Sequence, residues 1–374
     1  MVTPRASRPK KRDPRVPRLI RMWISDTSAR RVDQLAKTAA RKEIKWGIIG
    51  YGGAFNMGKG HAGWINASPG MKTIAVCDVD PKRVKVAEQE LPGVKTYTDY
   101  KEMLKNKEID CVVNILPHNL HYPVSMDTLA AGKGVCLEKP FCIKTEEATD
   151  MIELAKKKKV LLTVFHNRRH DGDYMAVKEF IDKGMIGEVF RIEAYMGGWG
   201  KPGKWWRSQK EISGGNFYDW GAHCVDWVLN FLEGRKIKNV TGFFQWNRVW
   251  TDVTNEDETQ AVVRFDDDVV ADITLSSIAK AGKPRWRILG TKGAIVDSWS
   301  GSFKAYLDVK GYPAEMEVKY KPTTWETWYP NLADHLLRGK ELEVKPEEAR
   351  RTIMVIDYAE RSAKAGKSID TPFE

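Results

Sequence analysis

Two ionisable side chains in an aromatic-rich stretch have the spacing of a catalytic pair. Asp219 and His223 lie four residues apart in the segment 213–226. On a helix, residues i and i+4 share one face, so the carboxylate can hydrogen-bond to the imidazole. Such a carboxylate raises the basicity of the ring and orients it, which suits a general base. A purely structural helix pair is the competing interpretation.

A glycine-rich turn follows the first apolar run of the chain, residues 45–49. Glycines there allow a tight turn and a close approach of the backbone to a pyrophosphate, and the next helix N-terminus adds amide donors. The expected phosphate-loop residues are Gly50, Tyr51, Gly52, Gly53 and Ala54.

This loop departs from the strict G-x-G-x-x-G pattern. The third glycine would stand at position 55, which is Phe55. We interpret residues 55–60 as a short insertion before the helix. The third contact of the loop is then expected from Ala54 or Gly58.

A second apolar run, residues 72–77, ends in Asp78. A carboxylate at this place binds both ribose hydroxyls of NAD and repels the 2′-phosphate of NADP. The sequence therefore favours NAD. Lys82 and Arg83 follow closely and keep NADP open as the alternative.

Polar clusters also follow three later strand-like runs, where the strands are expected to end. They are Leu116, Pro117, His118, Asn119 and His121; then Glu138 and Lys139; then His166, Asn167 and Arg168. In an open α/β sheet, ligands bind at the carboxyl ends of the strands. Because the histidines follow different strands, we expect contacts to cofactor or substrate, and no metal site.

The elements that must position these residues alternate between strand and helix as far as residue 166. The expected strands are 45–49, 72–77, 110–116, 134–137 and 160–165, with helices at 122–132 and 145–158. This order predicts a parallel, doubly wound sheet. We expect Thr145 to be the N-cap of its helix.

After a helix at 173–183 the apolar pattern changes to period two. The expected strands are 189–195, 240–246, 259–265, 269–276, 285–289 and 315–320, and a helix covers 346–364. This pattern predicts a second, α+β domain with a large and mostly antiparallel sheet. The expected division is a basic extension 1–44, a Rossmann domain 45–166 and an α+β domain 167–374.

Composition sets further limits. The net charge is +11, but residues 1–45 alone carry +10, so the body is nearly neutral and specific nucleic-acid binding is not expected. No apolar run approaches the roughly 18–20 residues of a membrane helix. The five cysteines form no CxxC pair, which predicts buried free thiols and a cytoplasmic protein.

The basic extension is rich in arginine and proline. Its first eighteen residues should be extended, and residues 28–42 have the pattern of a short amphipathic helix. A secretory signal is excluded because Arg21 and Asp26 interrupt the apolar stretch. A transit peptide, an arm that docks on a neighbouring subunit and a solvated tail remain open.

Taken together in their order, these motifs resemble the glucose–fructose oxidoreductase/inositol dehydrogenase (Gfo/Idh/MocA) family of NAD(P)-dependent oxidoreductases, from about residue 45 to the end. The resemblance rests on the glycine loop, Asp78, the strand-end clusters, Trp206–Arg207 and the segment 219–226. It implies a Rossmann domain, an open antiparallel sheet and a homodimer or homotetramer formed through that sheet.

The resemblance also implies roles for single residues. Lys139, Asp219 and His223 would form the catalytic set. The cofactor would be bound by the phosphate loop, Asp78, Arg83, the strand-end residues named above except His166, and Trp206 and Arg207. The substrate would be bound by Lys139, His166, Arg168, Tyr195, Trp205, Asp219 and His223.

The expected reaction is oxidation of a secondary hydroxyl on a sugar, cyclitol or related polyol. Hydride would move from the carbinol carbon to nicotinamide, His223 would accept the hydroxyl proton, and Lys139 would donate to the same oxygen. Asp219 would orient His223 or bind a neighbouring hydroxyl. Two alternatives stay open: a redox-neutral, NAD-dependent glycoside hydrolase and a non-catalytic dinucleotide sensor.

Overall fold

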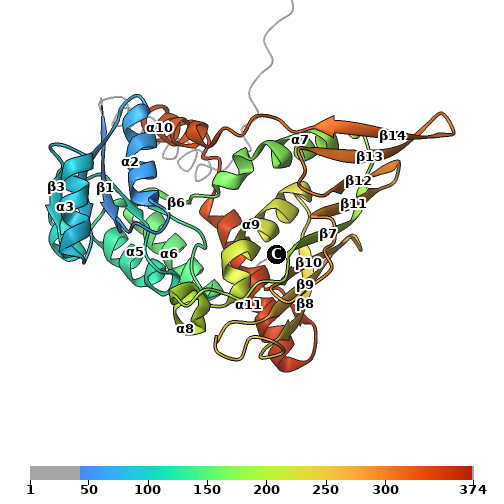
Figure 1. Ribbon diagram of the computed structural model, residues 1–374. Coiled ribbons are helices and arrows are strands. Elements are labelled where there is room, and N and C mark those ends of the chain that lie inside the picture. Colours follow the sequence, from blue (N-terminus) through green and yellow to red (C-terminus); the bar gives the residue numbers. More distant parts are fainter. Residues whose placement is uncertain (1–42, 373–374) are drawn as a thin grey trace, which may run out of the picture.

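The computed structural model describes residues 43–372, and these residues form two β-sheets with helices packed against them (Figure 1). The extension expected at 1–44, with its helix at 28–42, lies almost wholly outside the described residues. Within them, no helix is long and apolar enough to cross a membrane.

The first sheet is parallel and has the strand order β3-β2-β1-β4-β5-β6. Its strands are β1 (Ile44–Ile49), β2 (Met71–Cys77), β3 (Lys95–Tyr97), β4 (Cys111–Asn114), β5 (Gly134–Leu137) and β6 (Leu162–Val164). The helices that follow them are α2 (Met57–Ala67), α3 (Pro81–Glu90), α4 (Tyr100–Leu104), α5 (His121–Ala130) and α6 (Thr145–Lys158). This is the predicted doubly wound fold, and it brings the carboxyl ends of β1, β2, β4 and β5 to one edge.

The second sheet has nine strands in the order β14-β13-β12-β11-β7-β10-β9-β8-β15, and only the β7–β10 pair is parallel. The strands are β7 (Val189–Gly197), β8 (Ile237–Gln245), β9 (Glu258–Phe265), β10 (Val270–Ser276), β11 (Trp286–Gly290), β12 (Gly293–Asp297), β13 (Ser302–Val309), β14 (Tyr312–Lys319) and β15 (Ile369–Asp370). Figure 1 shows helices beside one face of this sheet, while the other face is open.

The remaining helices connect and cover the sheets. They are α7 (Gly172–Asp182), α8 (Lys210–Ser213), α9 (Asn216–Phe231), α10 (Trp328–Arg338) and α11 (Pro346–Ala365). The helix α9 buries nearly its whole length, which agrees with its long apolar run, and its aromatic residues pack on the second sheet. Short 3-10 turns lie at His118–Leu120, Asn167–His170, Trp206–Ser208 and Trp325–Thr327.

The helix α10 was missing from the sequence-based expectation. It follows the second sheet in the chain but packs on the first, where Trp328, Tyr329 and Leu332 share a core with Trp46 of β1 and Phe165. The C-terminal part of the chain therefore contributes to the core of the first sheet. The division at residues 44 and 166 stays a proposal.

The predicted cap of α6 is wrong by one residue. Lys144 is the N-cap, and Thr145 is the first helical residue. The amide and hydroxyl of Thr145 both donate to Asp357 Oδ2 in α11, at 3.0 and 2.8 Å. Glu147 of α6 itself accepts from the Lys144 amide at 3.2 Å. The backbone amides at the start of α6 therefore find acceptors both in α11 and in α6. All five cysteines are buried and free, as predicted.

Candidate active site

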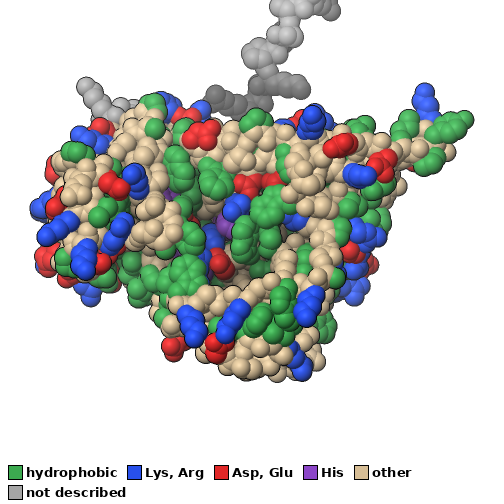
Figure 2. Space-filling view, in the orientation of Figure 1, with side chains coloured by type: hydrophobic (Ala, Val, Ile, Leu, Met, Phe, Trp, Pro, Cys, Tyr) green, Lys and Arg blue, Asp and Glu red, His purple; other side chains and the backbone are tan. Residues whose placement is uncertain are grey.

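A cavity of about 960 Å³ lies between the two sheets, at the carboxyl edge of the first. Figure 2 shows this hollow, with charged and histidine side chains visible inside it. Its walls come from the glycine loop, the ends of β2, β4 and β5, the segment after β6, the loop before α8, and α9. A volume of this size suits a dinucleotide together with a small substrate.

The glycine loop has the shape that a pyrophosphate needs. Gly50 has φ +98°, and a Cβ there would lie 2.5 Å from the Ile115 carbonyl oxygen, so only glycine fits. A Cβ on Gly52, which lines the cavity, would meet no atom within 4 Å, so the backbone there is open to a ligand. A Cβ on Gly58 would lie 2.6 Å from the Tyr51 ring. Gly58 therefore gives the close packing of helix and loop that the displaced third glycine would provide.

The Asp78 carboxylate stands at the same end of the cavity. Its Oδ2 accepts from the Tyr51 amide at 2.6 Å, and its Oδ1 accepts from the Asp80 amide at 2.9 Å. Each oxygen keeps a lone pair for a ribose hydroxyl. The guanidinium of Arg83 donates to the Tyr51 carbonyl at 2.7 Å, so Arg83 buttresses the loop. These residues fit the pyrophosphate and ribose of a dinucleotide.

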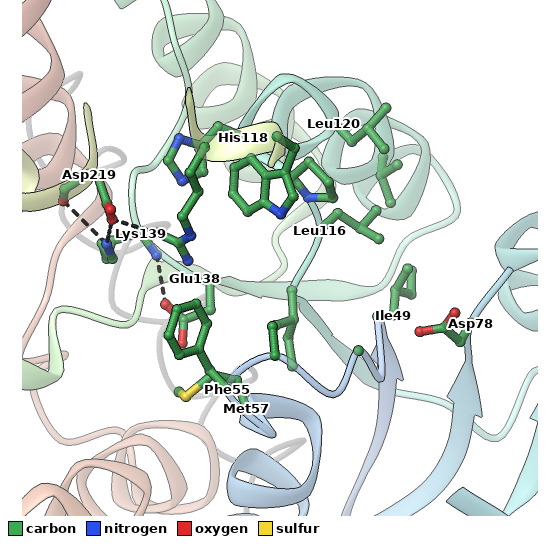
Figure 3. Close-up of a pocket in the computed structure, with 18 of the residues that line it drawn as sticks. Ile49, Phe55, Met57, Asp78, Leu116, His118, Leu120, Glu138, Lys139 and Asp219 are labelled. Atoms are coloured by element: carbon green, nitrogen blue, oxygen red, sulfur yellow. Dashed lines mark hydrogen bonds and ion pairs between the residues drawn. The ribbon is translucent and has the colours of Figure 1, made fainter. Parts of the chain in front are cut away.

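Lys139 and Asp219 meet at the opposite end of the cavity (Figure 3). The Lys139 ammonium donates to Asp219 Oδ1 at 2.5 Å, and Arg207 Nη1 donates to the same oxygen at 2.6 Å. Burial alone would raise the pKa of Asp219, but the charges of Lys139 and Arg207 hold it well below its usual range. Asp219 is therefore ionised and bridges two cations.

His223 lies one turn further along α9. The hydrogen bond that its ring could donate to Asp219 is not formed, because the carboxylate bonds to Lys139 and Arg207. The His223 ring stacks on Trp227, with centroids 6.0 Å apart and planes at 24°. Burial, followed by the charges of Lys139 and Arg168, lowers the pKa of His223 well below its ordinary value. The ring is therefore neutral, the form that accepts a proton.

The other predicted residues divide into two groups. Those that line the cavity are Gly50, Gly52, Ala54, Asp78, Leu116, Pro117, His118, Glu138, Lys139, Asn167, Arg168, Trp205, Trp206, Arg207, Asp219 and His223. Those that do not line it are Tyr51, Gly53, Arg83, Asn119, His121, His166 and Tyr195. Most of the second group support the wall from behind.

A single hydrogen bond, from Nδ1 to a backbone carbonyl, fixes the orientation of the His118 ring. Its Nδ1 donates to the Ser213 carbonyl at 2.7 Å, while its buried Nε2 has no hydrogen-bond partner in the described structure. The ring lines the cavity, but this acceptor nitrogen is itself buried. Behind it, His121 contacts the carbonyls of Leu116 and Pro140 at 2.9 and 2.6 Å and braces two cavity loops.

Two residues expected at the substrate lie elsewhere. His166 is buried behind His223, with ring centroids 6.4 Å apart, and burial lowers its pKa to about 4. Tyr195 is on β7, where alternation places it on the face opposite to the core residues Ile192 and Ala194. Asn119 borders a separate polar depression next to α11.

Sequence reasoning predicted Arg168 but missed three aromatic residues of the cavity, Phe55, Trp220 and Trp325. Arg168 lies between two indole rings, 4.5 Å from the centroid of Trp220 and 5.5 Å from that of Trp325. Phe55, in the predicted insertion, contacts Trp205 with centroids 5.6 Å apart and closes the loop over the cavity. Trp325 follows the second sheet in the chain, and no sequence signal connects it to Arg168. Across residues 43–372, no group of three His, Cys, Asp or Glu side chains is placed to hold a metal ion.

Comparison with known proteins agrees with this geometry. Residues 44–166 match the family model described as "Oxidoreductase family, NAD-binding Rossmann fold", and residues 174–296 match "GFO/IDH/MocA C-terminal domain". An uncharacterized oxidoreductase of Schizosaccharomyces pombe is 33% identical over 319 residues, which is 74% of this chain and 85% of that protein.

Two relatives in Bacillus subtilis have named activities. One is a scyllo-inositol 2-dehydrogenase (NADP(+)), 24% identical over 87% of this chain and 95% of its own length. The other is a scyllo-inositol 2-dehydrogenase (NAD(+)), 27% identical over 68% of this chain and 73% of its own length. The crystal structure of an NAD-binding protein from Listeria innocua superposes with a TM-score of 0.77 at 26% identity, covering 88% of this chain and 97% of that one.

Both matches thus point to one family: the first spans all six strands of the first sheet, and the second spans β7 to β11 and most of β12 of the second sheet. The glycine loop and Asp78 are placed as an NAD-binding Rossmann domain requires. The chain belongs to the Gfo/Idh/MocA family of NAD-binding oxidoreductases.

Proposed function

We propose that this protein oxidises a secondary hydroxyl of a cyclitol, sugar or sugar derivative, with NAD as the hydride acceptor. The observation that carries the proposal is the pairing of the Lys139 ammonium with Asp219 beside the buried, neutral His223. This set lies in the same cavity as the glycine loop and Asp78. The two named relatives, which are scyllo-inositol dehydrogenases, support the substrate class.

Each of the three residues has a separate task in this proposal. A bound nicotinamide supplies the hydride acceptor. His223 accepts the proton of the substrate hydroxyl on its neutral ring. Lys139 donates a hydrogen bond to the same oxygen and stabilises the charge that develops there. Asp219 holds the Lys139 ammonium in place and does not orient His223, which was one of its two expected roles.

The wall of the cavity near these residues suits a polyhydroxylated ring. Trp206, Trp220 and Trp325 line it and offer flat aromatic surfaces to the C–H faces of a sugar or cyclitol. Arg168, held between Trp220 and Trp325, presents a planar donor for hydroxyl groups.

The test is formation of NADH with a panel of cyclitols, aldoses, sugar acids and glycosides. We expect turnover with at least one polyol, and a loss of about 10²- to 10⁴-fold in Lys139→Met and His223→Gln. His170→Gln is the matched control, because His170 bonds to Thr327 outside the cavity. Cleavage of a glycoside without net NADH, or NADH binding without any turnover, would replace the proposal by the hydrolase or the sensor.

We also propose that two or more copies assemble through the open face of the second sheet. Alternation places Phe243, Val262 and Tyr306 on that face, and Phe243 is 55% exposed. Light scattering is expected to give a multiple of the chain mass of 42.6 kDa, and Phe243→Lys with Val262→Lys should reduce it to one chain. A wild-type mass of a single chain would refute this assembly.

A further inference from the structure

A buried chain of hydrogen bonds joins the C-terminal helix α10 to the residue next to Lys139. The Tyr329 hydroxyl in α10 is 2.6 Å from His61 Nδ1 in α2, and His61 Nε2 is 3.1 Å from Glu138 Oε1 at the end of β5. The other carboxylate oxygen of Glu138 accepts from the Lys139 amide at 3.1 Å, as Figure 3 shows. Neither His61 nor Tyr329 lines the cavity.

The partners determine where the protons lie along this chain. A carboxylate only accepts, so His61 Nε2 must carry a proton and donate it to Glu138. In a neutral ring, Nδ1 is then an acceptor, and the Tyr329 hydroxyl donates to it. Tyr329 thus selects the imidazole tautomer that binds Glu138, as a partner on one ring nitrogen commonly does for the other.

The residues around these hydrogen bonds hold the Tyr329, His61 and Glu138 side chains in place. His61 and Tyr329 are fully buried, and the His61 ring makes edge contacts with Trp64, Phe165 and Tyr329. The Glu138 side chain is only 14% exposed, yet it lines the cavity beside Lys139. A carboxylate in that place is a natural competitor for the Lys139 ammonium, which instead pairs with Asp219.

We propose that Tyr329 and His61 are positioning residues, which hold the Glu138 carboxylate on the Lys139 backbone so that the Lys139 ammonium pairs with Asp219. The proposal rests on the catalytic role proposed above for Lys139. Its physical basis is that the two donors on Glu138, His61 Nε2 and the Lys139 amide, fix the position of the carboxylate, while the Lys139 ammonium bonds to Asp219. Removal of the Tyr329 hydroxyl or of the His61 ring would release the Glu138 carboxylate toward the Lys139 ammonium.

The electrostatics of Glu138 agree with this geometry. Burial raises its pKa, but the hydrogen bond from His61, the charge of Lys139 and the Lys139 amide hold the pKa below its ordinary value. The titratable groups that face Glu138 are His61 of α2, Lys139, Cys136 of β5, His121 of α5, His166 after β6 and Tyr329 of α10. Loss of His61 should therefore raise the pH at which Glu138 is protonated.

Tyr329→Phe and His61→Gln test the proposal by kinetics. We expect kcat to fall about 3- to 10-fold in Tyr329→Phe and about 10- to 100-fold in His61→Gln, with KM for the polyol nearly unchanged. The acid limb of the pH profile should move to higher pH in both. Tyr320→Phe is the matched control, because it removes a hydroxyl that bonds to Asp297 in the second sheet. Equal losses in all three variants, or a loss confined to KM, would overturn the proposal.

A second measurement does not need turnover. Glu138 has a lowered pKa in the folded protein, so it stabilises the fold above its unfolded pKa of about 4.3, and this contribution is lost as pH falls. Urea unfolding at neutral and acidic pH measures the free energy of unfolding. This free energy should depend less on pH in His61→Gln than in wild type. In a Glu138→Gln background, His61→Gln should make no such difference. If the difference between His61→Gln and its parent persists in the Glu138→Gln background, the positioning role of Tyr329 and His61 is refuted, even when no polyol is oxidised. If the difference vanishes in that background while no polyol is oxidised, only the proposed function fails.

Discussion

Replacement of Asp78 by serine is expected to abolish a strong preference for NADH over NADPH. The Asp78 carboxylate is half-buried at the end of β2 and keeps one lone pair on each oxygen for a ribose. A 2′-phosphate in that place would add a charge of about −1.5 to −2. Two unit charges about 4 Å apart interact with about 1 kcal/mol in bulk water and about 4 kcal/mol near a protein surface. The phosphate charge of about 1.5–2 raises these two values to about 1.5–2 and about 6–8 kcal/mol.

Because Asp78 is half-buried, we expect the repulsion to lie between these limits, at about 2–4 kcal/mol. This corresponds to a preference of about 30- to 700-fold for NADH in the wild type. In Asp78→Ser the two dissociation constants should agree within about tenfold, because the repulsion disappears and hydrogen bonds to the ribose of NADH are lost. The added change Val79→Arg should favour NADPH further, since Val79 lines the cavity and is 85% exposed.

The assay is titration of the protein with NADH and NADPH, followed by fluorescence, at low and high salt. Asp99→Asn is the control, because Asp99 also lines the cavity but its carboxylate caps α4, a role that asparagine keeps. The preference should be smaller at high salt. Wild-type protein that binds NADPH as tightly as NADH, or an Asp78→Ser variant with an unchanged ratio, would refute the reasoning.

Three further predictions concern other parts of the molecule. Asp219→Asn should lower kcat by about 10²- to 10³-fold, because it leaves two cations facing each other without their shared anion; stopped-flow measurement of hydride transfer checks this, and an unchanged rate would contradict it. Gly242→Ala should destabilise the fold by about 1–3 kcal/mol or more without changing NADH affinity, because its Cβ would lie 1.8 Å from the Ala359 carbonyl oxygen; urea unfolding measures the loss. Asp226→Asn breaks a buried pair with Arg169 and should cost about 3–5 kcal/mol at neutral pH. Burial raises the pKa of Asp226, but the charge of Arg169 outweighs it and holds the pKa low. The difference in stability between Asp226→Asn and wild type should therefore shrink as pH falls below about 4 and vanish when the carboxylate is protonated. A stability difference that does not depend on pH would contradict this.

The sequence alone was sufficient for the fold class and for most of the cofactor end of the cavity. Those features depend on local patterns: an apolar strand followed by glycines, and a carboxylate at the tip of the next strand. Such patterns are set by residues close together in the chain, because the strand, the tight turn and the helix start each need particular residue types at fixed offsets. The strand Gly134–Leu137 and the helix Thr145–Lys158 have the bounds that their patterns predicted.

The end of the cavity that holds the proposed catalytic residues was predicted only in part. The sequence placed Asp219 and His223 on one helix face and indicated that their side chains could form a hydrogen bond. The bond is absent because Lys139 and Arg207, distant along the chain, offer Asp219 stronger charged partners. Spacing along a helix indicates which side chains can come into contact. Which of the possible partners a side chain bonds to depends on the residues that the whole fold brings near it.

What the sequence determined by itself was the family, the parallel sheet and the residue types available for chemistry. Only the tertiary structure decided which carboxylate pairs with Lys139, which tryptophans hold Arg168, and that α10 returns to place Tyr329 against His61. These contacts join residues separated by tens to hundreds of positions. They form because burial leaves each polar group only the partners that packing brings within reach, and no local pattern encodes that choice.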